Sequence, residues 1–400
     1  RADPIEGLPP LTGAFVGSIG WAMAREWEPS ITMSAPREMD VPDASLILAR
    51  DVAAIDHSDG SLWLVSNAWN MDGTDERVDW AYDEACRRVG DMCHRLESSM
   101  NPAVWVSVSP SSDDLAIQHR TPQDDFEQSV RDAKEAIGRG DAFQIVLSQR
   151  MDVSTQADAL DVYSVLRTLN PSPYLYLLRL PDGVGGDFDV VGSSPETLVR
   201  TQGQRVWTYP IAGSRPRGAN GSEDHALAVD LLKDPKELAE HAMLVDLARN
   251  DLSRVCRPES VEVSTLMEIK RYSHIQHISS TVTGIVNEGV DALDCLVATF
   301  PAGTLSGAPK TRAIQLIDEL EPCARGVYGG VVGYFDLGGD TDFAIAIRTA
   351  CLKDGRASVQ AGAGIVADSV EHTEYVETRN KAAAALASVL TAAKLTGDLD

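Results

Sequence analysis

Short apolar segments that arrive in neighbouring pairs constrain the fold of this chain more than any other feature. Segments 174–180 and 190–192 form one pair, and segments 330–335 and 343–349 form another. Their content of Val, Ile, Tyr and Phe is typical of strands. Because strands that are neighbours along a chain favour antiparallel hairpins over parallel βαβ units, the pattern predicts antiparallel sheets. Further strands are expected at 45–55, 61–65, 143–147, 206–209 and 358–361.

Helical segments separate these strands. One helix is expected to begin after Thr121, which can cap it, with Pro122 in its first turn. Gly138 and Gly140 can end the same helix. Other helices are predicted at 75–96, 158–169, 222–233, 236–248, 309–320 and 370–393.

A polar stretch divides the chain in two. Residues 109–120 break the apolar pattern, so we place a boundary there. This predicts an N-terminal region at 1–108 and a main domain at 121–395. Because the chain opens with Arg1 rather than Met, we also expect an upstream segment that this sequence does not include.

The composition excludes several classes of partner. A net charge of −25 argues against nucleic acid and against anionic membrane surfaces, since both select basic patches. No apolar run reaches the length that spans a bilayer. Six scattered cysteines without a C-x-x-C motif suit a reducing cytoplasm. Cys86 and Cys93 lie on one predicted helix face and are expected to be buried thiols.

Two pairs of glutamates carry the strongest chemical signal. Glu237 and Glu240 lie three residues apart on one predicted helix, and Glu374 and Glu377 do so on another. Residues at this spacing share a helix face, so each helix can aim two carboxylates at one point. Clustered carboxylates suit a hard cation such as Mg²⁺. The alternative is two solvated helix faces, which is the commoner origin of such pairs.

Two glycine-containing segments could approach a ligand closely. Segment 300–310 (FPAGTLSGAPK) supplies the hydroxyl of Thr304 but lacks the G-K-[ST] of a phosphate loop, and a structural turn is its alternative. Segment 360–366 (QAGAGIV) places Gly362 and Gly364 where bare backbone N–H groups could hold a carboxylate. Taken alone, a bulge or tight packing is the commoner explanation of such glycines.

Charged and polar side chains complete the candidates. Arg348 ends a run that is apolar on both faces, and a buried guanidinium needs an anion, either a substrate or a structural carboxylate. Lys381 follows Glu377 by four residues, which by itself is an ordinary surface pair. His277 is interpreted as a hydrogen-bond donor to substrate, with a core histidine as the alternative. Glu196 follows a strand, and a carboxyl shielded from water can hold its proton near neutral pH and act as a general acid.

Together these segments resemble the chorismate-utilising enzymes, and most closely those of the anthranilate synthase component I type. Matching stretches include GDAFQIVLSQR (140–150), VGSSPETLVR (191–200), DPKELAEHAMLVDLARNDLSRVC (234–256), FPAGTLSGAPKTRA (300–313) and QAGAGIVADS (360–369). The resemblance implies an α+β fold in which two large antiparallel β-sheets pack across each other, with helices on the outside and the site in a cleft between the sheets. It also implies that 1–108 is the remainder of the family's N-terminal region.

The resemblance implies roles for the four glutamates. Glu240 and Glu377 would ligate Mg²⁺, with Glu237 and Glu374 close behind and positioning bound waters. The metal would hold the ring carboxylate of chorismate. The residues implied in the other anionic contacts to substrate are Tyr328, Arg348, Gly362, Gly364 and Lys381.

Four further residues receive roles in the same way. His277 and Thr304 would lie along the substrate. Ser214 stands where the family usually has Thr, so its hydroxyl is retained and the methyl group is not. Glu196 would protonate the departing 4-hydroxyl.

Two positions separate the branches of the family. Relatives that add water carry Lys where this chain has Gln144, and relatives that aminate the other ring carbon carry Lys where it has Ala212. A Lys with a lowered pKa can activate water, whereas an amide cannot, and ammonia needs no base. The resemblance therefore implies amination of chorismate at C2, followed by loss of pyruvate to give anthranilate, a step of tryptophan biosynthesis.

Ammonia needs a source outside this chain. No G-x-C-x-G nucleophile motif is present, so a separate glutamine amidotransferase subunit is expected, with a channel between the two active sites. NPSPY (170–174) matches one half of the family's tryptophan feedback site, and the upstream half is absent from this sequence, so feedback is an expectation for a longer protein only. The alternatives are a synthase that stops at 2-amino-2-deoxyisochorismate and a non-catalytic chorismate-binding subunit.

Overall fold

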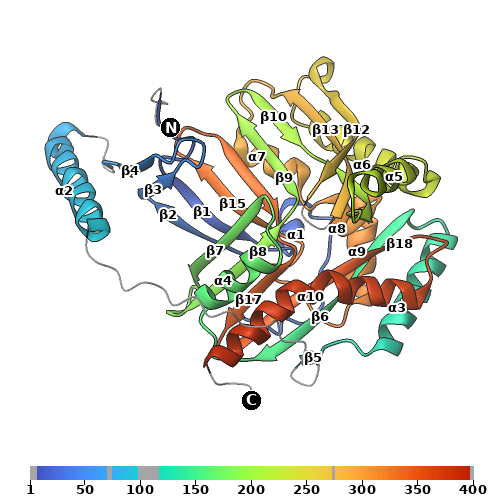
Figure 1. Ribbon diagram of the computed structural model, residues 1–400. Helices are drawn as coiled ribbons and strands as arrows, with labels where there is room; N and C mark the ends of the chain where they lie inside the picture. Colours follow the sequence, from blue (N-terminus) through green and yellow to red (C-terminus); the bar gives the residue numbers. More distant parts are fainter. Residues whose placement is uncertain (1–6, 70–73, 98–116, 273–274, 397–400) are drawn as a thin grey trace.

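The structure, a computed structural model, describes residues 7–69, 74–97, 117–272 and 275–396. Within these residues, two large antiparallel sheets form the body of the protein (Figure 1). A hairpin of β3 (Asp51–Ile55) and β4 (Leu62–Ser66) stands beside them. The expected α+β fold with two large antiparallel sheets is confirmed.

The first of these, a sheet of nine described strands, runs in the order β11-β13-β10-β9-β16-β15-β1-β2, with β12 beside β13. Its members are β1 (Ala14–Ile19), β2 (Ala44–Ala49), β9 (Thr197–Gln202), β10 (Arg205–Thr208), β11 (Ile211–Pro216), β12 (Glu262–Arg271), β13 (Ile275–Ile285), β15 (Val331–Asp336) and β16 (Thr341–Ile345). Because β1 pairs with β15, the N-terminal part of the chain extends the same sheet.

The second, with seven described strands, runs in the order β14-β6-β18-β17-β8-β7, with β5 beside β6. Its members are β5 (Ile117–His119), β6 (Gln144–Ser154), β7 (Tyr174–Pro181), β8 (Asp187–Ser194), β14 (Gly307–Ala308), β17 (Thr349–Lys353) and β18 (Arg356–Ile365).

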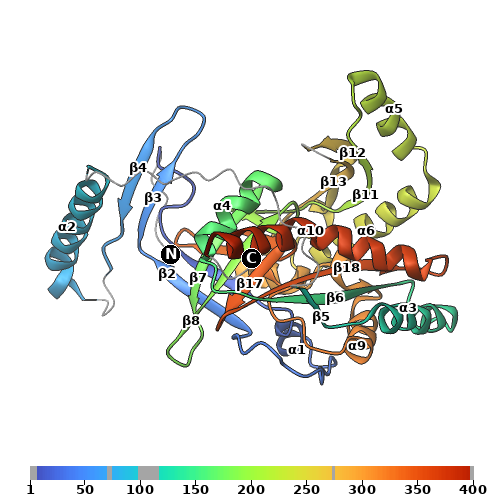
Figure 2. The same ribbon diagram turned by 60° about the horizontal axis from the view of Figure 1, so that its bottom comes forward.

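Helices lie outside the sheets. Those against the seven-stranded sheet include α3 (Gln123–Gly138), α4 (Ala159–Leu169), α9 (Lys310–Leu320) and α10 (Glu371–Thr396), of which α10 lies over β18 (Figure 2). Those against the nine-stranded sheet include α5 (Gly221–Leu231), α6 (Pro235–Ser253) and α7 (Ala292–Thr299). The remaining α-helices are α1 (Met23–Trp27), α2 (Val78–Glu97) and α8 (Gly303–Ser306).

The two faces of β6 and β18 differ in chemistry. The strands pair in register, with Ser148 opposite Gly362 and Arg150 opposite Gln360, and residues directly opposed share a face. The outer face packs on the helices and is mostly apolar: Ile145, Leu147, Met151, Val153, Ala357, Val359, Ala361, Ala363 and Ile365. The inner face, on the other side, is mostly polar or glycine: Gln144, Val146, Ser148, Arg150, Asp152, Ser358, Gln360, Gly362 and Gly364.

Two predicted strands are each divided in the structure. The run 45–55 breaks at Arg50, so that β2 joins the nine-stranded sheet while β3 pairs with β4. The run 343–349 breaks into β16 and β17, which belong to different sheets. Both runs are mostly apolar, and apolar content does not signal a change of sheet.

The prediction that Thr121 caps the helix that follows it is wrong. Pro122 occupies the N-cap position of α3, and no side chain in the described part of the protein caps the helix. Thr121 is buried one residue earlier, too far from the first turn to cap it. The predicted end is confirmed, since the last helical residue is Gly138 and Gly140 follows at a φ of 86°.

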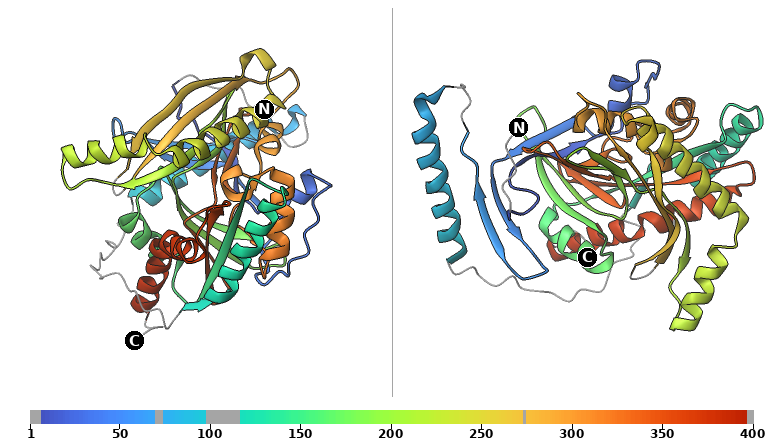
Figure 3. Two further views of the ribbon diagram at one scale, coloured as in Figure 1. Left: turned by 90° about the vertical axis from the view of Figure 1, so that its right-hand side faces the viewer. Right: turned by 90° about the horizontal axis from the view of Figure 1, so that it is seen from above.

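The β3–β4 hairpin and α2 project from the main body (Figure 3). Helix α2 buries only Ala81, Ala85 and Arg88. Cys86 and Cys93 are exposed, so their predicted burial is wrong. Helical periodicity marks an apolar face, but it does not say how much of that face a neighbour covers.

The boundary predicted at 109–120 stays a prediction, because residues 98–116 lie outside the described residues. Among the helices described, none has the length and apolar character needed to cross a membrane.

Candidate active site

The chain passes between the two large sheets at several points, and candidate residues lie at three of them. Glu196 lies between β8 and β9, Arg348 lies between β16 and β17, and Thr304 lies in α8 just before β14. Two crossings are joined by backbone hydrogen bonds. The Ile345 N–H donates to the Glu196 carbonyl at 2.9 Å, and the Ser193 N–H donates to the Arg348 carbonyl at 3.2 Å. The candidate site therefore lies between the sheets.

Glu196 is the acidic group at the centre of this site. Burial raises the pKa of its carboxyl to about 7, against the opposing effects of the Thr304 hydrogen bond and of the charges on Lys381 and Arg348. The Thr304 hydroxyl donates to Glu196 Oε1 at 2.9 Å. A carboxyl with this pKa keeps its proton in about half of the molecules at neutral pH and in more of them below it, so it can deliver a proton to a leaving group.

Arg348 is the cationic group beside it. Its backbone has a φ of 51°, in the left-handed region that non-glycine residues rarely adopt, at the point where the chain changes sheets. Burial lowers the pKa of its guanidinium, while the charges of Glu196 and Tyr272 oppose that shift. Among the described residues, Arg348 forms no ion pair. A largely desolvated guanidinium in this condition favours an anionic ligand.

Tyr272 and His277 form an aromatic wall next to these charges. Their rings lie 5.9 Å apart, edge to face. His277 Nδ1 lies 2.9 Å from the Gly213 carbonyl, so it carries a hydrogen there, and burial lowers the pKa of the imidazole. In that neutral form Nε2 is an acceptor. Sequence reasoning missed Tyr272, although it stands inside the RYSHIQH stretch that carries His277.

Lys381, Tyr328 and the two glycines of β18 lie on one side of the site. Lys381 Nζ donates to the Gly362 carbonyl at 3.1 Å and pairs with Glu377 at 2.7 Å. A Cβ on Gly362 would meet the Tyr328 hydroxyl at 2.8 Å, and a Cβ on Gly364 would meet Gln144 Nε2 at 2.4 Å. The Leu147 carbonyl also lies 2.8 Å from the Cβ position of Gly362 and cannot move aside, so glycine is required there, whereas the contact at Gly364 is with the end of a flexible side chain.

Gln144 begins the inner face of β6 at this site. Its Nε2 donates to Glu240 Oε1 at 3.2 Å. Its Oε1 is buried and has no hydrogen-bond partner within the described residues. Ala212 is buried on β11, and Ser214 lies opposite His277 with an exposed side chain.

Each predicted glutamate pair lies together on its helix. Burial and the charge of Glu240 raise the pKa of Glu237, and burial and the charge of Glu377 raise the pKa of Glu374. Lys236 of α6 lowers the pKa of Glu374 on α10, so the starts of the two helices face each other.

No group of three or more metal-capable side chains converges among the residues described. Glu377 is paired with Lys381, and Glu237 lies 3.5 Å from Arg215. The donor set fits a hard divalent cation, because its carboxylates repel one another within each helix and a cation would relieve that repulsion. The spacing predicted the pairs, whereas the assembly of all four around one ion stays a prediction.

The chain is similar in sequence and in structure to proteins that are already known. The family described as chorismate binding enzyme matches residues 2–387. Anthranilate synthase component 1 of Mycolicibacterium smegmatis is 51% identical over 396 residues, which cover 99% of this chain and 75% of that protein. The relative of the same name from Arthrobacter globiformis is 50% identical over 397 residues, covering 99% and 74%. The crystal structure of anthranilate synthase component I from Streptococcus pneumoniae superposes with a TM-score of 0.83 at 37% identity, covering 96% of this chain and 82% of that one.

Proposed function

We infer the function from the premise that the chain belongs to the family of chorismate-binding enzymes. It is an enzyme that acts on chorismate, with the fold of anthranilate synthase component I. Within that frame we propose that it is the large subunit of an anthranilate synthase, which aminates chorismate at C2 with ammonia and then eliminates pyruvate.

The observation that carries this proposal is the identity and setting of Gln144. Its amide lies on the inner face, bound to Glu240 and packed on Gly364, at the position from which relatives that hydrate chorismate would present a lysine. An amide cannot deprotonate water, whereas the lone pair of ammonia is free to attack without a base. Ala212, at the second branch position, offers no nucleophile.

The proposed reaction balances through Glu196. Ammonia forms a bond to C2, the ring double bonds shift, and the 4-hydroxyl leaves as water with the proton of the Glu196 carboxyl. The ammonium formed on C2 releases a proton, which restores the acid. In the product, 2-amino-2-deoxyisochorismate, the hydrogen on C2 leaves as a proton and the bond from C3 to the enolpyruvyl oxygen breaks, and that proton and the enolpyruvyl group together make pyruvate, which leaves anthranilate. Thr304 orients Glu196, and Arg348 binds the enolpyruvyl carboxylate, which is the anion its desolvated guanidinium lacks.

Mg²⁺ belongs to the same proposal. Glu240 and Glu377 would hold the ion, and Glu237 and Glu374 would hold its waters. When bound it would neutralise the ring carboxylate of chorismate, which a protein with a net charge of −25 otherwise repels. Ammonia would come from a separate glutamine amidotransferase subunit.

The test is an assay of the purified chain with chorismate, Mg²⁺ and ammonium. We expect fluorescent anthranilate, with pyruvate released in equal amount and detected by coupling to lactate dehydrogenase. Accumulation of 2-amino-2-deoxyisochorismate without pyruvate would instead assign the enzyme that stops after amination. Isochorismate as the main product would overturn the proposal.

A further inference from the structure

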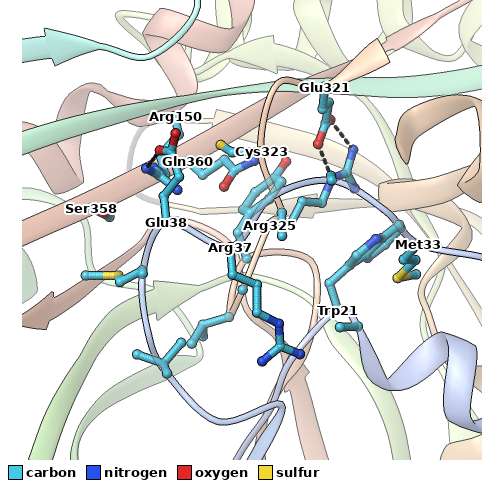
Figure 4. Close-up of a pocket in the computed structure, with 18 of the residues that line it drawn as sticks. Trp21, Met33, Arg37, Glu38, Arg150, Glu321, Cys323, Arg325, Ser358 and Gln360 are labelled. Atoms are coloured by element: carbon cyan, nitrogen blue, oxygen red, sulfur yellow. Dashed lines mark hydrogen bonds and ion pairs between the residues drawn. The ribbon is translucent and has the colours of Figure 1, made fainter. Parts of the chain in front are cut away.

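Arg325 is a buried cation beside the candidate site that the proposed reaction does not use. Its side chain is 1% exposed, and that of its partner Glu321 is 5% exposed. The two groups form a fork, in which Arg325 Nε lies 2.9 Å from one carboxylate oxygen and Nη2 lies 2.6 Å from the other (Figure 4). A buried ion pair is weak evidence for stability, because removing both charges from water costs about as much free energy as their attraction contributes. The other contacts of the guanidinium are therefore a better guide to its role.

Two further hydrogen bonds join the guanidinium to main-chain atoms beside site residues. Arg325 Nη1 donates to the Leu305 carbonyl at 2.7 Å, and Nη2 donates to the Val146 carbonyl at 2.7 Å. Leu305 follows Thr304 in α8, and Val146 lies two residues after Gln144 in β6. Together with the fork, these bonds fix both the position and the plane of the guanidinium, which the ammonium group of a lysine would not do.

Tyr328 lies against this fixed cation. Arg325 Cζ is 5.5 Å from the centroid of the Tyr328 ring and 4.3 Å from the centroid of the Trp21 ring. Contacts between a desolvated cation and aromatic faces are attractive. Gly329 follows Tyr328 with a φ of 74°, and a Cβ there would meet the Trp21 ring at 3.0 Å. The two rings and the guanidinium therefore pack closely as one unit.

The hydroxyl of Tyr328 is free, in contrast to its ring. None of the described residues forms a hydrogen bond with it. It lies beside Gly362, where a Cβ would meet it at 2.8 Å. Burial raises the pKa of this hydroxyl, while the charge of Arg325 opposes the rise. The hydroxyl is therefore a protonated donor without an acceptor in the described part of the protein, and the contacts of its ring decide where it lies.

The N-terminal region takes part in this arrangement through Trp21. Its side chain is buried, and its backbone N–H donates to the carbonyl of Gly326, the residue after Arg325, at 2.9 Å. Sequence reasoning assigned no site residue before Gln144. Trp21 thus supports the site from a distance, because it contacts the guanidinium that lies against Tyr328.

We propose that Arg325 is a positioning residue, which holds the Tyr328 hydroxyl where it donates a hydrogen bond to a carboxylate of the substrate. The proposal rests on the function proposed above in taking chorismate as that substrate. Arg325 itself does not touch chorismate. It fixes the ring of Tyr328, and its charge makes the hydroxyl a stronger donor, because a nearby cation favours the deprotonated form of a phenol. Tyr328 and Arg348 then share the binding of the carboxylates.

The test is a double-mutant cycle on the dissociation constant of chorismate, measured by calorimetry with Mg²⁺ and without ammonium. Tyr328→Phe removes the donor and should weaken binding roughly tenfold to a hundredfold, as expected for a hydrogen bond to a charged group. Arg325→Lys keeps the buried charge but loses the fork, so the hydrogen bond is weakened and binding should fall roughly threefold to tenfold. The double variant should bind no more weakly than Tyr328→Phe alone, because the position of an absent hydroxyl has no effect.

Two further variants separate positioning from stability. Trp21→Leu leaves the ion pair intact and should weaken binding roughly twofold to fivefold, the contribution of one cation–π contact. Arg150→Lys is the matched control, because Arg150 is also a buried arginine, and its hydrogen bonds go to Asp152 and Glu38 rather than to site residues. It should leave the dissociation constant unchanged. In every variant a loss of folded protein lowers the calorimetric stoichiometry and not the affinity.

Three results would overturn the proposal. They are an unchanged affinity in both Arg325→Lys and Trp21→Leu, effects of Arg325→Lys and Tyr328→Phe that multiply in the double variant, and an equal loss of affinity in Arg150→Lys. Failure of the wild-type chain to form anthranilate, with the expected cycle on chorismate binding, rejects the proposed function instead and leaves the positioning role in place.

Discussion

The inner and outer faces of β6 and β18 are built from alternate residues of the same strands, yet they do different work. Outer residues such as Leu147 and Ala363 are buried against helices α3 and α10. Inner residues hydrogen-bond to polar side chains instead: Gln144 to Glu240, Ser148 to Glu321, and Gln360 to Ser148. Because side chains alternate along a strand, one segment of sequence can supply stability on one face and chemistry on the other. Variants on the two faces should therefore separate activity from stability.

The largest effect is expected at the site that the inner face borders. Glu196→Gln keeps the shape of the side chain and removes its proton, so kcat should fall by roughly 10²–10⁴. The measurement is anthranilate formation at saturating chorismate and ammonium, beside urea unfolding of the same preparation. In the wild type, kcat should also decline above about pH 7, where Glu196 loses its proton. A variant that kept activity within tenfold of wild type would remove Glu196 from its proposed role.

The next variant tests whether the inner face also contributes to stability. Glu321 receives hydrogen bonds from the Ser148 backbone and hydroxyl at 2.8 and 2.7 Å and from Arg325. Glu321→Gln leaves the Arg325 charge buried without its partner, which costs about 3–5 kcal/mol in the free energy of unfolding. Asp91→Asn, which removes an exposed partner of Arg87, is the control and should leave the unfolding midpoint unchanged.

On the outer face the expected change is in stability without a change in chemistry. Leu147→Ala should lower the free energy of unfolding by about 2–5 kcal/mol, since its side chain is almost fully buried and a cavity remains. Leu147→Met, which conserves volume, should cost less than about 1.5 kcal/mol. Denaturant titration measures both. A fall in kcat of the folded Leu147→Ala protein comparable to that of Glu196→Gln would contradict the division between the faces.

The pH dependence of stability sharpens the same comparison. The raised pKa of Glu196 lets the folded state keep a proton that the unfolded state loses, so this contribution is full below about pH 4.5 and lost as pH rises through about 7. It amounts to on the order of 3 kcal/mol. His241, whose burial lowers its pKa to about 4, has the opposite slope, because its contribution is full above pH 6.5 and lost as pH falls through 4.

These two slopes offset each other in the wild type. Glu196→Gln should therefore be more stable than the wild type near neutral pH, while its stability declines more steeply from pH 6.5 towards 4. Urea denaturation of both proteins between pH 4 and 8 measures the difference. Two parallel curves of stability against pH would show that Glu196 titrates alike in the folded and unfolded states.

The smallest change in stability is expected at Gln149, which is a polar residue on the mostly apolar outer face. Gln149 is buried there and donates to the Thr378 hydroxyl of α10. Gln149→Met loses that hydrogen bond but removes an amide oxygen that has no partner among the described residues, so the free energy of unfolding should change by less than about 1 kcal/mol. Calorimetric Tm and kcat should both match the wild type. A loss of several degrees in Tm would show that the amide oxygen has a partner in solution.

Much of the fold follows from the sequence because strand and helix patterns are local. The predicted strand at 174–180 and the predicted helix at 158–169 match β7 and α4 to within about two residues. The changes of sheet at Arg50 and before Arg348 could not be predicted, since no local pattern marks which sheet a strand joins. Residues distant in sequence decide that, and the arrangement of the sheets came from the resemblance.

The sequence predicts part of the candidate site in the same way, and the rest depends on contacts between distant residues. The spacing of Glu237 with Glu240 places two carboxylates on one helix, but the position of α6 relative to α10 depends on tertiary packing. The protonated state expected of Glu196 agrees with its burial. Tyr272 was missed because a tyrosine within a strand-rich stretch gives no chemical signal until His277 is seen against it.

Arg348 sits where the polypeptide leaves one sheet and enters the other, and Glu196 sits at the neighbouring crossing. Recombination between relatives would normally treat each sheet as an exchangeable module. In this protein Glu196 and Arg348 belong to the connections between the sheets, so a chimera that took one sheet from each parent would be joined at the residues of its own site. Shuffling experiments on this scaffold should therefore place their breakpoints in peripheral loops, such as the β3–β4 turn, and keep both junctions from a single parent.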